Sequence, residues 1–125
     1  MLEGKRAWFR VYYAFGEILL CWWDDQTHMY TELTPDEEDR FGLAGLREAM
    51  ATIQKICALD FFSSEIAFTD SSRFVIVDYV NEVCDMRLKS VYYDGAPDAI
   101  VHRIEHLIAS HVKSHLNMNK ELIPA

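Results

Sequence analysis

The sequence lacks an excess of positive charge. In 125 residues it has 12 Lys and Arg against 20 Asp and Glu, which gives a formal net charge of −8. Nucleic-acid binding depends on a basic face that displaces counterions from phosphates, so this balance argues against nucleic acid as a partner. A nucleotide ligand remains open, because a divalent cation can bridge carboxylates to phosphates.

Long apolar runs and paired cysteines are also missing. The longest apolar-looking stretch, 14–23, is interrupted by Gly16 and Glu17 and is too short to span a bilayer. The first residues lack the basic-then-apolar order of a signal peptide. The three cysteines are widely spaced and form no CxxC motif. These absences predict no membrane partner and a cytoplasmic protein with reduced thiols.

Hydrophobic and aromatic residues are plentiful. Half of the chain is hydrophobic, with three Trp, six Tyr and seven Phe. This composition and length suit one domain with a dense core. We expect a single domain over 1–125, with its core within about 7–116 and a frayed tail at 117–125.

Apolar periodicity predicts an α+β fold with the order β-β-α-β-β-α. Hairpins link the strands, so we expect an antiparallel sheet of about four strands with helices packed on one face. The acidic stretch 24–39 reads as a solvated loop and a helix start. The predicted elements are strands at 7–15 and 18–23, a short helix capped by Thr34 that ends near Gly42, a helix at 43–57, strands at 60–69 and 73–80, and a helix after a turn at 94–97.

Two carboxylates face each other in the second predicted hairpin. A tight turn at 71–72 places Glu65 directly opposite Asp78, with Cβ atoms ~5 Å apart. A four-residue loop that leaves Thr69 opposite Phe74 gives the same pairing. A three-residue loop would break this alignment, so the pairing depends on the turn.

Facing carboxylates need a proton, a basic partner or a metal. Asn81 follows Asp78 closely and adds a neutral oxygen. A set of oxygen ligands alone suits Mg²⁺, which keeps several waters and is completed by substrate phosphates. The alternative is that Glu65 and Asp78 are two exposed carboxylates on the solvent face of the sheet.

Two segments carry a resemblance to a known family. The run 59–87, LDFFSSEIAFTDSSRFVIVDYVNEVCDMR, resembles the C-terminal half of the ATP-grasp catalytic core. The segments 9–12 (FRVY) and 16–18 (GEI) look like that family's R-V-x-V-x-G-G-E-V strand pair. The resemblance covers roughly 7–110, and it lies in the order and spacing of the pieces.

This resemblance implies a Mg-ATP site. Glu65, Asp78 and Asn81 would hold the Mg²⁺ of Mg-ATP. Arg10 would act on phosphate or the acyl-phosphate intermediate, and Arg87 towards phosphate or substrate. The implied reaction is ATP-dependent activation of a small carboxylate as an acyl phosphate, which an amine or thiol then attacks.

The chain departs from the family in three ways. Asp78 and Asn81 stand in place of E-x-N, which puts Asn81 on the wrong face of a regular strand unless a bulge re-aims it. Trp22 and Trp23 stand where a second Arg is common. The family's N-terminal half, with its phosphate-binding lysines, has no counterpart in this sequence, so we expect no ligase turnover from the chain alone. The alternative is a non-catalytic module that binds a protein partner or forms a homodimer.

The histidines form two further pairs. His102 with His106 and His111 with His115 have the i, i+4 spacing that can bind zinc. The sequence has no HExxH motif and no obvious shared acidic ligand, which favours a solvated histidine face. Cys84 has no histidine near it in sequence and is not predicted as a nucleophile.

Overall fold

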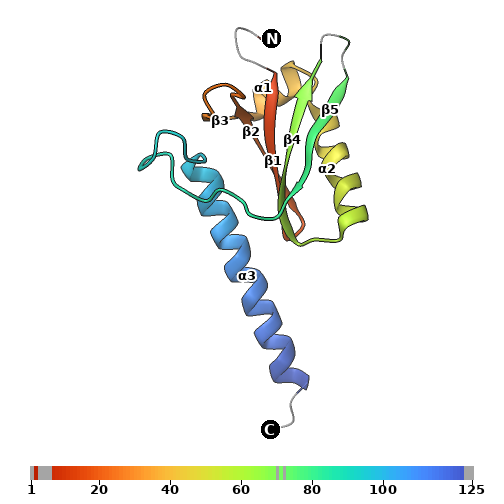
Figure 1. Ribbon diagram of the computed structural model, residues 1–125. Coiled ribbons are helices and arrows are strands. Elements are labelled where there is room, and N and C mark those ends of the chain that lie inside the picture. Colours follow the sequence, from red (N-terminus) through yellow and green to blue (C-terminus); the bar gives the residue numbers. More distant parts are fainter. Residues whose placement is uncertain (1, 3–6, 70, 72, 123–125) are drawn as a thin grey trace.

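The computed structural model describes residues 2, 7–69, 71 and 73–122, with side chains as far as 117. Its elements, in chain order, are β1 (Trp8–Ala14), β2 (Glu17–Trp23), β3 (Tyr30–Glu32), α1 (Pro35–Arg40), α2 (Ala44–Cys57), β4 (Phe61–Phe68), β5 (Phe74–Asn81) and α3 (Asp98–Leu122). The strands form one antiparallel sheet in the order β3-β2-β1-β4-β5 (Figure 1). The α+β class and the antiparallel sheet are therefore confirmed.

Helices lie on both faces of the sheet, so the prediction of helices on one face is wrong. Phe9 and Val11 of β1 are buried in a core that includes α2. Tyr12 and Ala14 of the same strand are buried against α3 on the opposite face. Because β1 presents large apolar side chains to both sides, each face needs cover. α3 covers this second face near its start and then runs away from the sheet, so part of the face, beyond the N-terminal end of α3, is left for the candidate site (Figure 1).

A fifth strand lies where the sequence predicts a loop. β3 pairs with β2, with Tyr30 opposite Trp23 and Glu32 opposite Cys21. The chain reverses between the two strands through a turn in which Asp24 Oδ1 accepts hydrogen bonds from the next backbone N–H groups. Three residues are too few to show a strand pattern, and only the burial of Tyr30 ties β3 to the core.

The predicted helix start is confirmed. The Glu37 N–H donates to Thr34 Oγ1 at 3.2 Å, and the Thr34 N–H donates to Glu37 Oε1 at 3.1 Å, with Pro35 in the first turn. α1 therefore begins and ends close to its predicted limits. α2 follows it, and the residues that α2 buries are Leu46, Met50 and Ile53.

α3 is longer than predicted and extends well beyond the sheet (Figure 1). It continues to Leu122, through positions where the sequence predicts a frayed tail, and 123–125 lie outside the described residues. No Gly or Pro interrupts the helix before that point. Ile104 is buried against the sheet, whereas the side chains of 112–117 are all exposed. Of the helices in the described part of the chain, none combines the length and apolar character needed to cross a lipid bilayer.

Candidate functional site

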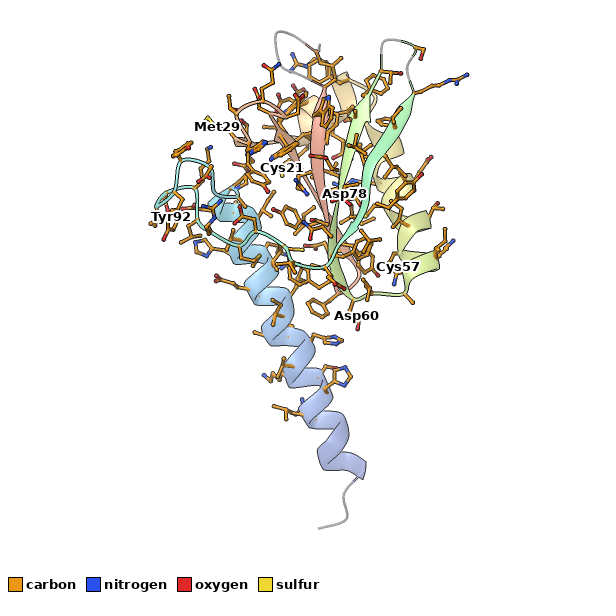
Figure 2. All side chains as sticks on the ribbon, in the orientation of Figure 1. Cys21, Met29, Cys57, Asp60, Asp78 and Tyr92 are labelled. Carbon is orange, nitrogen blue, oxygen red and sulfur yellow. The ribbon has the colours of Figure 1, made fainter. Side chains whose placement is uncertain are left out.

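β4 and β5 bring the two predicted carboxylates into direct opposition. Glu65 pairs with Asp78 across the ladder, and Figure 2 marks Asp78 on β5. The end of the hairpin differs from both predicted turns, because Phe68 rather than Thr69 lies opposite Phe74. Positions 70 and 72, in the region of the predicted turn, lie outside the described residues. The predicted pairing is therefore present, but the predicted turn does not produce it.

The first of two β-bulges on β5 produces the pairing instead. Ile66 pairs with Ile76, so a regular ladder would place Val77 opposite Glu65. The register shifts by one residue at this point, and Asp78 takes that place. A bulge inserts one extra residue on one strand and re-aims the side chains that follow it.

The second bulge brings Asn81 to the same face. Ser63 pairs with Asn81, although a regular ladder from the Glu65–Asp78 pair would place Val80 there. Side chains alternate between the faces of a strand, so Asn81 shares the face of Glu65. The extra residue that separates this sequence from E-x-N is therefore absorbed by the second register shift.

Arg10 lies on the neighbouring strand β1, on the same face of the sheet as Glu65. It lies opposite Glu65 in the β1–β4 ladder, with Arg10 Nη2 3.6 Å from Glu65 Oε1. The side chains are 12% and 11% exposed, so this ion pair is mostly shielded from water. Burial raises the pKa of Glu65; the negative charge of Asp78 acts in the same direction and Arg10 opposes both.

Arg10 and Arg87 line one cavity. Its volume is about 210 Å³, and its walls are formed by Arg10, Trp23, His28, Tyr30, Asp85, Arg87 and Asp94. The Arg10 guanidinium lies over the Trp23 ring at 4.8 Å, and that ring stacks on His28 at 5.3 Å. The two arginines for which the family resemblance implies contacts with phosphate or substrate thus line the same cavity.

A closed loop between β5 and α3 holds Arg87 at this cavity. Arg87 Nη2 donates to Asp85 at 3.0 Å, and Arg87 Nη1 donates to Asp94 at 3.2 Å. Gly95 closes the loop, because a Cβ at that position would lie 2.6 Å from the Arg87 carbonyl oxygen. Figure 2 marks Tyr92, whose ring lies under the Arg87 guanidinium, within this loop. The sequence does not reveal Asp85 and Asp94 as partners of this site, because no motif spacing connects them to Arg10.

The donor set fits Mg²⁺. Glu65, Asp78 and Asn81 offer two carboxylates and an amide oxygen on one face, and the Asn81 oxygen also accepts the Val83 N–H at 3.1 Å. Over the described ranges, no three His, Cys, Asp or Glu side chains gather as a metal site. Mg²⁺ commonly takes one or two carboxylates from the protein and its other ligands from water and phosphate. Glu65, Asp78 and Asn81 are thus the residues that could hold such an ion.

The comparisons with known proteins add no relative. No protein family, curated protein or solved structure matches the chain. The fold and the site define an α+β domain with carboxylates and a guanidinium group on one face of its sheet and a second guanidinium group on the adjoining loop. The functional argument therefore depends on this geometry.

Proposed function

We propose that the chain is the C-terminal part of an ATP-grasp ligase, and that it forms one wall of a Mg-ATP site. The observation that carries the proposal is the convergence of Arg10, Glu65 and Asp78 on one face of three adjacent strands. Asn81 joins them through the second bulge. The substrate class that goes with this proposal is a small carboxylate, activated as an acyl phosphate.

The guanidinium groups suit a phosphate ligand. Arg10 Nε is buried and has no hydrogen-bond partner among the described residues, so it offers a donor that a phosphate oxygen can use. Arg87 reaches the same cavity from the loop before α3. Mg²⁺, when bound, neutralises phosphate charge, and the two arginines add donors where charge develops during phosphoryl transfer.

Mn²⁺ with ATP tests this site, because the ion broadens nearby NMR signals. We expect the amide signals of β4 and β5 around Glu65 and Asp78 to broaden first when Mn-ATP is added. The double variant Glu65→Gln with Asp78→Asn should weaken Mn-ATP binding by at least about tenfold, because two charged ligands are lost.

A matched variant distinguishes binding at this site from nonspecific binding of the metal to the acidic surface. Asp36→Asn with Glu48→Gln removes the same charge from exposed positions on α1 and α2. Mn-ATP binding should be nearly unchanged in this control. Equal weakening in both double variants, or broadening spread evenly over the acidic surface, would rule the proposed site out.

One observation favours the second candidate, a self-associating module. An apolar groove of about 320 Å³ lies between α2 and β5, lined by Ala49, Thr52, Ile53, Ile56, Cys57, Ile76, Tyr79 and Val80. β5 is an edge strand, and the Ile56 and Tyr79 beside this groove are 81% and 62% exposed. Open strand edges and large apolar patches are typical of interfaces. The second candidate function is therefore self-association into a homodimer through this groove.

Sedimentation measured over a range of concentrations tests the dimer. We expect self-association of the wild-type chain and its loss in Ile56→Asp, because a charge would be buried at the interface. Val91→Asp is the control, since Val91 is 68% exposed in the loop before α3. A wild-type chain that stays monomeric at millimolar concentration would exclude this function.

A further inference from the structure

Two histidine side chains converge on the part of α3 that extends beyond the sheet. The Nε2 atoms of His111 and His115 lie 3.1 Å apart. Two nitrogens bound to one zinc ion at ~2.0–2.1 Å in tetrahedral geometry are about 3.3 Å apart. The two imidazoles are therefore already close to the separation that a shared metal requires.

The ring of His111 is held in place by the turn between β1 and β2. The ring of His111 packs on Phe15 with centroids 4.5 Å apart, and Phe15 in turn stacks on Phe61 at 6.1 Å. The backbone of Phe15 is fixed because its N–H donates to the Asp60 carbonyl at 2.7 Å, in the segment that Figure 2 marks by Asp60. A ligand that is already oriented loses less entropy on binding.

We propose that His111 and His115 form a binding site for a divalent metal of the Zn²⁺, Ni²⁺ and Cu²⁺ class. Imidazole nitrogens suit these ions, whereas Mg²⁺ prefers oxygen ligands. The remaining coordination positions face solvent, because His115 is exposed and α3 has left the sheet by this point (Figure 1). The site uses none of the residues assigned to Mg-ATP and is independent of the proposed function.

The same helix contains a matched pair with a different geometry. His102 and His106 have the same i, i+4 spacing on α3. His102 Nδ1, however, faces Glu105 Oε2 at 3.6 Å. The two pairs therefore have the same spacing in sequence. The close approach of the ring nitrogens distinguishes the pair His111 and His115 from the pair His102 and His106.

Calorimetric titration of the full chain with ZnCl₂ tests the site, with NiCl₂ as a second probe. His115→Ala should weaken binding by at least about tenfold, because the second imidazole acts at high effective concentration. His102→Ala should leave the affinity unchanged, and so should Glu65→Gln with Asp78→Asn. Excess MgCl₂ should not displace the bound ion.

Three results would overturn the inference. These are wild-type affinity in His115→Ala, an equal loss in His102→Ala, and displacement of Zn²⁺ by Mg²⁺. His115 is exposed near the end of a helix, and Ala favours helix, so loss of folding does not complicate the test. Because the Mg-ATP variants retain this site, its failure and the failure of the proposed function give different results.

Discussion

Arg10→Met is expected to lower the free energy of unfolding by about 3 kcal/mol at neutral pH. The substitution keeps an apolar stem on β1 but removes the positive charge that lies 3.6 Å from the Glu65 carboxylate. Glu65 would remain mostly shielded from water, with Asp78 opposite it and without the guanidinium group of Arg10. A buried charge without its partner costs more than the net contribution of the intact pair.

The stability that Arg10→Met loses should increase as the pH rises. Burial raises the pKa of Glu65, so the native state binds this proton more tightly than the unfolded chain does. The contribution of such a group to stability is fully present below the unfolded pKa and is lost as pH rises through the native pKa. Removing Arg10 takes away the charge that opposes the shift, so the native pKa rises further. The deficit of Arg10→Met should therefore be large at pH 7.5 and smaller at pH 5.

Urea denaturation at these two pH values measures the effect. Adding Glu65→Gln to Arg10→Met should restore part of the lost stability, because the unpaired charge is gone. Arg40→Met is the control: Arg40 pairs with Asp36 at 3.6 Å in an exposed position, so its loss should change stability by less than about 1 kcal/mol. If Arg10→Met has the same deficit at both pH values, Glu65 is not the group left without a partner.

The parts of the fold predicted correctly are those with local signals. The capping box at Thr34 and Glu37 is contained within four residues, and the stripe on α2 repeats over several turns. β3 was missed because three residues carry no period. The last helix was predicted, but its place on the second face was not, because the pattern of β1 does not say which helix covers which side. These features are decided by contacts between distant segments.

The candidate site also depends on contacts between distant segments, which the sequence does not reveal. Counting residues along a hairpin predicts that Glu65 faces Asp78, but the strands near the hairpin end, where Phe68 lies opposite Phe74, do not have the register that the count assumed. The first bulge restores the predicted register, the second brings Asn81 opposite Ser63, and a bulge leaves no period in the sequence. Trp23, His28 and Asp94 reach the cavity from separate loops and strands, so no spacing rule connects them to Arg10.

Ser64 stabilises the second bulge, and its removal is the other large expected effect. Ser64 lies on β4 between Ser63 and Glu65, is fully buried, and donates its hydroxyl hydrogen bond to the Tyr79 carbonyl oxygen. Tyr79 lies in the stretch of β5 where the register shifts. Ser64→Ala would leave this carbonyl without its side-chain donor, which costs about 1–3 kcal/mol. Urea denaturation measures that loss.

The same substitution connects the bulge to the Mg-ATP proposal. Without the donor from Ser64, β5 loses support for the register that places Asn81 opposite Ser63. Mn-ATP binding should therefore weaken in Ser64→Ala although no proposed ligand has been removed. Ser71→Ala is the matched control, since Ser71 lies in the same hairpin and its hydroxyl contacts Thr69 at 3.0 Å in an exposed position. If Ser64→Ala loses stability but binds Mn-ATP as the wild type does, Asn81 is not needed at the metal. The ligand set would then reduce to the two facing carboxylates.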